Sequence, residues 1–441
     1  MRFFIKSYGC QMNSYDSQRI GDLLIAAGHE PSSSLDEANL VILNTCSIRE
    51  KAEDKIFSDL GRLKIIKEKS SEKFLITVVG CMARLRSAEI VRRVPYVDAI
   101  LGPGEIHRMA DIVEDISGDK KKDVVVSVSA AAADKFSQLS DKFFNRSVSE
   151  FLTVQEGCNN FCSYCIVPHT RGREFSRSVS DVVREAKKLV SSGVKEIILL
   201  GQNVNSYKGE GRDGKSRNLA FLLFELAAVD GLKRLRYTTS HPKDADAELG
   251  RAHRDIEILM PFLHLPVQSG SDEVLRRMKR PYTRAEYLKC VDTMRGYRPD
   301  MAFSSDFIVG FPGESDGDFQ QTLQLAEEVG YALAYSFKYS PRPNTAAALM
   351  KNCVPEEVKS ERLRVLQTLL DKQQSEFNQS FAGKHLNVLF VKKGRHKNQL
   401  VGRSEYSQAV SVCDNNISIG DVARVKITGM ASHSLIGTVE Q

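Results

Sequence analysis

The sequence predicts an α/β protein in three parts. The first is an N-terminal, flavodoxin-like domain with a parallel sheet (residues 1–118), followed by a linker (119–143). The second is a central, incomplete (β/α)6 barrel (144–378), and the third is a small C-terminal β-barrel (379–441). Two long regions in which apolar strands alternate with helices predict the first two domains. A change to short alternating strands predicts the third.

Three apolar runs define the first sheet. Residues 2–8, 40–43 and 74–79 are predicted strands, and helical periodicity follows in 15–27 and in a charged stretch up to Lys69. Continuously apolar strands joined by helices are typical of a parallel sheet that is covered on both faces.

A cysteine stands just after each of these strands, at Cys10, Cys46 and Cys81. The carboxyl ends of parallel strands line one edge of a sheet, so we expect the three thiols to converge. Gly9 and Gly80 precede two of them and permit a close approach of the backbone. Three buried structural cysteines are the alternative. Placement after three strands out of three favours a metal cluster with three protein ligands.

The linker is charged at 119–123 and alanine-rich at 130–133, with one short candidate strand at 124–126. The central region then resumes alternation, with helices such as 181–191 and 318–329 and a closing helix at 355–377. Its six strands are predicted at 151–154, 196–200, 235–239, 262–265, 303–309 and 335–339. Six such units predict an incomplete barrel whose active site lies at the carboxyl ends of its strands.

The loop after the first of these strands contains Cys158, Cys162 and Cys165 in the spacing C-x3-C-x2-C. Three thiolates on a four-iron cube leave one iron free for another ligand. A Cys3His zinc knuckle completed by His169 is the alternative. Because a zinc knuckle usually organises a short module, a loop that opens a long strand–helix region favours the cluster.

The C-terminal strands are predicted at 386–391, 399–401, 409–412 and 422–427. This region contains eight basic and four acidic residues, so it carries most of the net charge of +6. A basic β-module of this size predicts a polyanionic partner, nucleic acid first. The candidate RNA-binding residues are Lys392, Lys393, Arg395, Lys397 and Arg403.

The N-terminus lacks the apolar core of a signal peptide, and no apolar run is long enough for a membrane span. We therefore expect a cytoplasmic protein without a membrane partner. In that compartment, nine cysteines indicate metal binding or catalysis rather than disulfides. Cys290, Cys353 and Cys413 are isolated and are expected to be packing residues or free thiols.

Several long motifs resemble those of the methylthiotransferases, a group within the radical S-adenosylmethionine (SAM) superfamily. Tyr164, just before the last cysteine of the loop, fits the superfamily signature. The group's motifs are SYGCQMN (7–13), NTC (44–46), GCMA (80–83), EGCN (156–159), VPHTRG (167–172), GQNVNSY (201–207), TSHP (239–242), HLPVQSGS (264–271) and DFIVGFPGE (306–314). The chain departs from the group at Asn344 and Ala346, where relatives usually carry Gly and Pro.

The resemblance is strongest to the members that convert N6-isopentenyladenosine, at tRNA position 37 next to the anticodon, into its 2-methylthio derivative. It implies two 4Fe–4S clusters, one on each set of three cysteines. It also implies SAM as the source of both a radical and a methyl group, and a C-terminal TRAM domain that binds RNA. The expected partners are the anticodon loop of tRNA and an electron donor such as flavodoxin or ferredoxin, and the chain is expected to be a monomer. SAM contacts are expected at Tyr164, Gly201, Gln202, Asn203, Ser304 and Asp306.

Two other functions remain open from the sequence. Sister enzymes methylthiolate threonylcarbamoyl-adenosine in tRNA or a ribosomal protein. A non-enzymatic RNA-binding protein with structural zinc is the third reading.

Overall fold

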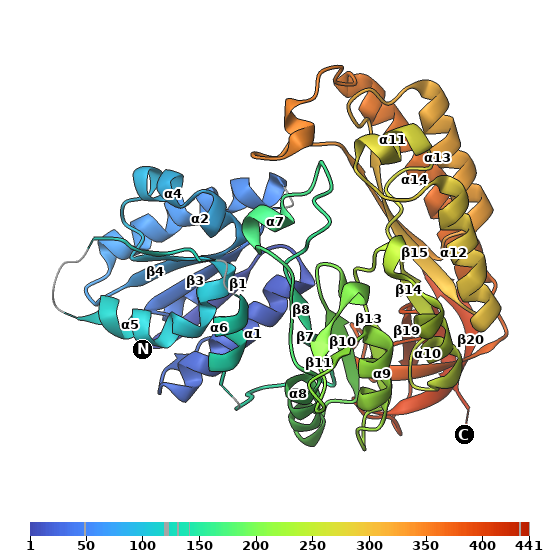
Figure 1. Cartoon of the computed structure of the whole chain (residues 1–441). Coiled ribbons are helices and arrows are strands. Elements are labelled where there is room, and N and C mark those ends of the chain that lie inside the picture. The colour runs from blue at the N-terminus through green and yellow to red at the C-terminus, as the bar shows by residue number, and fades with distance from the viewer. Residues whose placement is uncertain (48–49, 119–122, 130–131, 141, 432–433, 441) are drawn as a thin grey trace.

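The computed structural model describes residues 1–47, 50–118, 123–129, 132–140, 142–431 and 434–440. Figure 1 shows the N-terminal domain in blue and cyan, the central strands and helices in green, yellow and orange, and the C-terminal strands in red. All three expected architectures are present.

The N-terminal sheet has six parallel strands in the order β2-β1-β3-β4-β5-β6. Strand order therefore reverses between β1 and β3, as it does in flavodoxin-like folds, where ligands bind at that reversal. The strands are β1 (Arg2–Ser7), β2 (Glu30–Pro31), β3 (Leu40–Thr45), β4 (Leu75–Gly80), β5 (Ala99–Leu101) and β6 (Val125–Ser127). The helices are α1 (Gln11–Ala26), α2 (Glu50–Lys69), α3 (Cys81–Leu85), α4 (Ser87–Arg93) and α5 (Met109–Ser117).

Both faces of this sheet are covered, as the apolar strands predicted. Every residue of β3 is buried. Val41 and Leu43 join one apolar core, whereas Leu40 and Ile42 join the core on the opposite face. Alternate residues of a strand point to opposite faces, so a strand buried between two helical layers has to be apolar throughout.

The segment expected as a linker contains more structure than a connection. β6 is the short strand expected near 124–126, and it pairs with β5 at the edge of the N-terminal sheet. Helix α6 (Ala132–Gln138) follows and was not expected from the sequence. Parts of the charged and alanine-rich runs, 119–122 and 130–131, lie outside the described residues.

The central domain contains all six expected strands, arranged as the parallel sheets β13-β10-β7 and β14-β15-β16. A parallel bridge between Leu235 and Leu259 continues one sheet toward the other, which gives the open barrel. The strands are β7 (Ser149–Thr153), β10 (Glu196–Leu200), β13 (Arg234–Tyr237), β14 (Phe262–His264), β15 (Ala302–Val309) and β16 (Leu333–Lys338). The covering helices are α8 (Val179–Ser191), α9 (Leu219–Ala227), α10 (Ala247–Asp255), α11 (Asp272–Arg277), α12 (Arg284–Tyr297), α13 (Asp316–Val329) and α14 (Glu356–Gln379).

Short elements surround the cysteine loop. The pair β8 (Gln155–Glu156) and β9 (Phe175–Ser176) brackets it, with α7 (Val167–Thr170) between them. The hairpin β11 (Gly209–Glu210) and β12 (Ser216–Arg217) precedes α9.

The C-terminal strands close into a barrel in the order β17-β18-β19-β21-β20. They are β17 (His385–Lys393), β18 (Gln399–Arg403), β19 (Ala409–Cys413), β20 (Val422–Ala431) and β21 (Ser434–Val439). The sequence predicted four of the five, and β21 was missed. In the described part of the chain, no helix is both long and apolar enough to cross a membrane.

Candidate active site

The first cysteine set lies at the carboxyl end of β8, on a loop held by backbone contacts. Gly157 has φ +79°, and a Cβ there would lie 2.0 Å from the carbonyl oxygen of Arg173. Only glycine fits both the left-handed conformation and this space. The Cys165 N–H donates to the Cys162 carbonyl at 2.9 Å, and the Ser163 N–H donates to the Met278 carbonyl at 3.0 Å. The loop is therefore fixed at both ends.

The three thiols of this loop are close enough to affect one another. Burial raises the pKa of Cys165 to about 12, and the charges of Cys162 and Cys158 add to the increase. Burial also raises the pKa of Cys158. His169, the fourth ligand of the zinc reading, is exposed on α7. Buried thiols that disfavour their own thiolates need a cationic group among them, such as an iron–sulfur cluster, to be charged.

Arg280 is a site residue that the sequence reading missed. Its Nη1 lies 3.7 Å from Cys162 Sγ, its Nη2 donates to the Pro266 carbonyl at 2.6 Å, and its Nε donates to the Tyr282 hydroxyl at 2.7 Å. The side chain is buried. Its guanidinium is therefore held in place as a donor to the Cys162 sulfur. A sequence separation of 118 residues left no local signal for this contact.

The expected SAM residues 201–203 lie beside the cysteine loop and partly serve to hold it. The Gly157 N–H donates to Gln202 Oε1 at 2.5 Å. Gln155 Oε1 accepts from the backbone N–H groups of Gln202 and Asn203 at 2.9 and 3.3 Å. A Cβ on Gly201 would lie 2.6 Å from that same oxygen. The turn after β10 is thus placed against the loop, with the Gln202 side chain engaged in positioning it.

Ser304 and Asp306 lie on one face of β15, together with His264 of β14. His264 Nδ1 is 2.8 Å from Ser304 Oγ, and His264 Nε2 is 3.5 Å from Asp306 Oδ2. The neighbours Phe303 and Phe307 join the apolar core under the helices. Since residues alternate along a strand, the polar trio faces the interior of the open barrel. Tyr164 packs with Val274, Phe311 and Tyr339 in a separate apolar cluster.

Three of the buried polar atoms without a hydrogen-bond partner among the described residues lie just after β10 and β13: Asn203 Oδ1 after β10, and Ser240 Oγ and His241 Nε2 after β13. Buried polar groups are nearly always satisfied, so unpaired ones indicate a missing ligand. Their positions at the carboxyl ends of barrel strands fit a polar ligand such as SAM or a nucleoside.

The second cysteine set lies where the strand order of the N-terminal sheet reverses. Cys10 follows β1, Cys46 follows β3 and Cys81 begins α3 after β4. A hydrogen bond from Cys46 lowers the pKa of Cys10 to about 6. Burial raises the pKa of Cys81, and the nearby Cys10 charge contributes. All three are therefore neighbours.

Gly9 permits the close approach that the sequence predicted, and the group that approaches it is the side chain of Cys46. At φ +112°, a Cβ on Gly9 would lie 2.7 Å from Cys46 Sγ. Asn13 supports the arrangement: its Oδ1 accepts from Cys10 Sγ at 3.1 Å, and its Nδ2 donates to Asn44 Oδ1 at 2.8 Å.

Among the described residues, no three His, Cys, Asp or Glu side chains form a set that could hold a single metal ion. A cube of four irons is larger than one ion, and its thiolate ligands are correspondingly further apart. Two sets of three neighbouring cysteines suit such cubes in donor chemistry.

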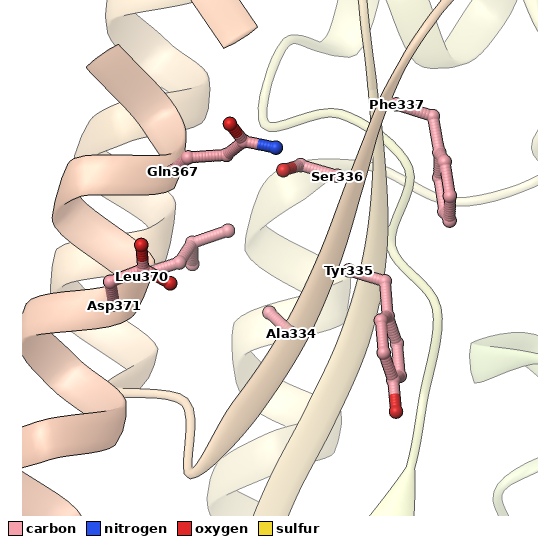
Figure 2. Close-up of a pocket in the computed structure, with 7 residues that line it drawn as sticks. All are labelled: Ala334, Tyr335, Ser336, Phe337, Gln367, Leu370 and Asp371. Carbon is pink, nitrogen blue, oxygen red and sulfur yellow. The ribbon is translucent and has the colours of Figure 1, made fainter. Parts of the chain in front are cut away.

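A pocket of about 340 Å³ lies between β16 and α14, away from the cysteines. Figure 2 shows Gln367 and Leu370 of α14 on one side of β16, with Tyr335 and Phe337 pointing away from that helix. These two rings are 49% and 48% exposed. Tyr335 is paired in register with Asp306, so the two side chains share the interior face of the open barrel.

The expected RNA-binding residues of the C-terminal barrel are all exposed: Lys392, Lys393, Arg395, Lys397 and Arg403. The first two end β17, the next two occupy the β17–β18 turn, and Arg403 ends β18. Arg403 Nη1 donates to the Ser407 carbonyl at 3.0 Å.

The fold and the C-x3-C-x2-C loop together define a radical SAM enzyme. The model of the radical SAM superfamily matches residues 152–326, that of the TRAM domain matches 379–439, and that of the uncharacterized protein family UPF0004 matches 2–102. The chain belongs to the family of tRNA-2-methylthio-N(6)-dimethylallyladenosine synthases. Two proteins of that name, from Bartonella bacilliformis and Bartonella henselae, are 51% and 50% identical to it, over 99% of this chain and 96% of each relative.

Solved structures show the same fold in more distant proteins. The radical SAM methyltransferase TsrM from Kitasatospora setae has a TM-score of 0.59 at 14% identity, and the match covers 79% of this chain and 77% of that one. The cobalamin-dependent radical SAM enzyme OxsB has a TM-score of 0.52 at 11% identity, covering 84% of this chain and 56% of that one. At these identities the likeness concerns the fold alone.

Proposed function

We propose that this protein is a tRNA methylthiotransferase that converts N6-isopentenyladenosine, at position 37 beside the anticodon, into its 2-methylthio derivative. The main support for this proposal is that the chain is about 50% identical, over 99% of its length, to synthases of that product. It has the cysteine loop, the open barrel and the RNA-binding module that the reaction requires. Isopentenyl and dimethylallyl denote the same N6 substituent.

The family uses one 4Fe–4S cluster with SAM, and Cys158, Cys162 and Cys165 are the ligands for it. We assign a second 4Fe–4S cluster to Cys10, Cys46 and Cys81. Bound SAM and clusters supply the radical, the sulfur and the methyl group, which acid–base side chains cannot provide for a C–H bond of adenine. The protein contributes position and exclusion of water.

The residues around the barrel opening have separate tasks in this proposal. The unpaired Asn203 Oδ1, Ser240 Oγ and His241 Nε2 bind the polar groups of SAM or of the nucleoside. Ser304 and Asp306, held by His264, bind ribose hydroxyls. Gln202 keeps the cysteine loop against the end of β10.

The target base has to leave its stack in the anticodon loop to enter the barrel. Tyr335 and Phe337, half-exposed toward that interior, provide ring faces on which it can stack. The basic residues of the C-terminal barrel contact phosphates elsewhere on the tRNA.

We propose the same domain boundaries as the sequence predicted: an N-terminal domain (1–118), a linker (119–143), a radical SAM domain (144–378) and a TRAM domain (379–441). Tyr164 and Gly201 border the SAM site, and Lys392, Lys393, Arg395, Lys397 and Arg403 contact RNA. We further propose a cytoplasmic monomer that receives electrons from a flavodoxin or a ferredoxin.

The direct test is nucleoside analysis of total tRNA from cells that lack this gene. We expect 2-methylthio-isopentenyladenosine to disappear and isopentenyladenosine to accumulate. The intact gene restores the product, and a Cys162→Ala gene does not. Loss of only the methylthio derivative of threonylcarbamoyl-adenosine, or an unchanged tRNA profile with an altered ribosomal protein, would replace this substrate with one of the sister substrates.

The division of labour between the cysteine sets is tested with purified protein. Cys10→Ala is expected to abolish methylthiolation while reductive cleavage of SAM continues, and Cys162→Ala is expected to abolish both. Iron analysis after anaerobic purification distinguishes the iron–sulfur enzyme from the alternative, an RNA-binding protein with structural zinc. Zinc without iron or sulfide would rule out the radical mechanism.

A further inference from the structure

Four charged side chains form a closed, buried ring between the two cysteine sets. Lys135 Nζ lies 2.7 Å from both Asp16 Oδ1 and Glu156 Oε2. Arg171 Nη1 lies 2.8 Å from Glu156 Oε1, and Arg171 Nη2 lies 2.9 Å from Asp16 Oδ2. None of the four side chains is more than 2% exposed.

The ring joins segments that are far apart in the sequence. Asp16 lies on α1 of the N-terminal domain and Lys135 on α6, whereas Glu156 on β8 and Arg171 after α7 flank the first cysteine loop. Two cations and two anions are balanced, but burying them carries a large desolvation cost. Apolar residues of similar size would join the domains at least as well, so stability alone does not explain the ring.

Arg171 also reaches the second cysteine set. It is close enough to Cys81 to hydrogen-bond with that sulfur, and its charge acts on Cys10 as well. Its Nη2 has two N–H groups, and the ion pair with Asp16 Oδ2 at 2.9 Å occupies at most one of them. Nη2 has no other partner among the described residues, so its second N–H remains available.

A second arginine near Cys81 also has an N–H group without a partner. Arg84, on α3 three residues after Cys81, is within the influence of that thiol's charge. Its Nη1 is buried and likewise lacks a partner in the described chain. Two buried guanidinium N–H donors beside one cysteine indicate an acceptor at that place that the protein does not supply. Sulfur atoms of an anionic cluster would be such an acceptor.

The first cysteine set has a comparable donor, because Arg280 Nη1 lies 3.7 Å from Cys162 Sγ. We propose that Arg171 and Arg84 are positioning residues for the second cluster, donating N–H groups to its sulfur atoms, and that the buried ring holds Arg171 in place. This inference rests on the proposed function, which assigns the second cluster to Cys10, Cys46 and Cys81. Hydrogen bonds and positive charge at cluster sulfur favour the reduced state, so both arginines raise the reduction potential of that cluster.

The test compares two double variants of the full-length, iron-loaded protein. Arg171→Met/Asp16→Asn leaves Lys135 and Glu156 as the buried pair, and Lys135→Met/Asp16→Asn leaves Arg171 and Glu156. Each double variant removes one cation and one carboxylate from the ring. The two variants therefore differ only in whether Arg171 or Lys135 remains. Reduction potentials of both clusters are measured by titration followed by electron paramagnetic resonance, and SAM cleavage is measured without tRNA.

We expect the second cluster of Arg171→Met/Asp16→Asn to have a more negative potential than that of Lys135→Met/Asp16→Asn. SAM cleavage is expected to be equal in the two. Equal potentials at the second cluster would overturn the role of Arg171 and leave the ring as a purely structural joint. A wild-type protein with iron for only one cluster would instead contradict the proposed second cluster itself.

Arg84→Met provides an independent arm, because Arg84 is outside the ring and only partly buried. It is expected to shift the potential of the second cluster in the same negative direction and to leave the first unchanged. The control is Arg92→Met, an exposed arginine on α4. If neither Arg84→Met nor the Arg171 double variant shifts the second potential relative to its control, the proposal is wrong.

Discussion

Gly157 shows how strictly one residue can define the cysteine loop. A side chain there would meet the Arg173 carbonyl at 2.0 Å and would also have to adopt φ +79°. Gly157→Ala is therefore expected to displace the loop and prevent cluster assembly, measured as loss of iron and of the visible absorbance of one cluster. Gly193→Ala is the matched control, since φ is +102° there but nothing lies within 4 Å. It should cost about 1 kcal/mol of stability and keep full iron content.

If both alanine variants retained all their iron, the close contact at Gly157 would not determine the loop.

His253 is expected to make stability depend on pH. It is buried, its Nε2 is 2.6 Å from the Tyr237 hydroxyl, and burial lowers its pKa to about 3. As the pH falls below about 6.5, the unfolded chain binds a proton that the folded ring refuses, so the free energy of unfolding decreases by up to ~1.4 kcal/mol per pH unit. Urea titrations at pH 7.0 and 5.0 measure this decrease.

His253→Gln cannot take up that proton and should show a smaller decrease between the two pH values, whatever its stability at pH 7.0. An identical decrease in the variant would mean that other groups account for the pH dependence.

At the residue scale, the sequence predicted which cysteines lie together but not which groups contact them. The six cysteines were found because each set has a local signature, either the spacing of one loop or a place after successive strands. Arg280 carries no such signature, and Arg171 lies in the VPHTRG motif, which does not indicate its partner. Their partners Cys162 and Asp16 are brought to them only by the folded domains.

At the level of elements, the edge strand β16 makes a prediction about substrate binding. Its inward residues Tyr335 and Phe337 are half-exposed, and Tyr335 is in register with Asp306. Tyr335→Ala is expected to raise the KM for tRNA about five-fold or more, because base stacking on an aromatic ring contributes about 1–3 kcal/mol. SAM cleavage without tRNA should stay unchanged.

The control for Tyr335 is Phe224→Ala on α9, a ring with a similar exposed fraction of 46% on the helical outside of the domain. An unchanged KM in Tyr335→Ala would remove β16 from the substrate site.

Elements were predictable in proportion to their length and apolar content. The buried strands β3, β4, β10 and β15 were found within a few residues of their ends. β2 and β5 have two and three residues, too few for a periodic pattern, and they form by pairing with neighbours. α6 has seven residues and begins within the alanine-rich run that predicted a linker, although its Lys135 completes the buried ring.

At the scale of the whole molecule, two arginines at the start of β13 attach the C-terminal barrel to the central domain. Arg234 donates to the carbonyl oxygens of Arg403 and Asn387, each at 2.6 Å. Arg236 donates to the carbonyls of Ser404 and Glu405 at 2.7 and 2.8 Å. These contacts are at the amino ends of the barrel strands, opposite the cysteine loop. The C-terminal barrel is thus attached to the end of the central domain opposite the cysteine loop. In the proposed function, this position lets it contact a part of the tRNA other than the reacting base.

Arg234→Met tests whether this attachment matters for the reaction. It removes two hydrogen bonds from a charged donor, each contributing about 1.5–3 kcal/mol, while the contact of Arg236 with Glu196 stays intact. We expect the barrel to stay folded but loosely attached, so that limited proteolysis cuts faster between α14 and β17. We also expect the KM for tRNA to rise, with SAM cleavage unchanged. Arg251→Met, at an exposed ion pair of 3.9 Å on α10, is the control. Equal proteolysis and an equal KM in both variants would show that other contacts hold the barrel; faster proteolysis with an unchanged KM would show that tRNA binding does not need it to be fixed.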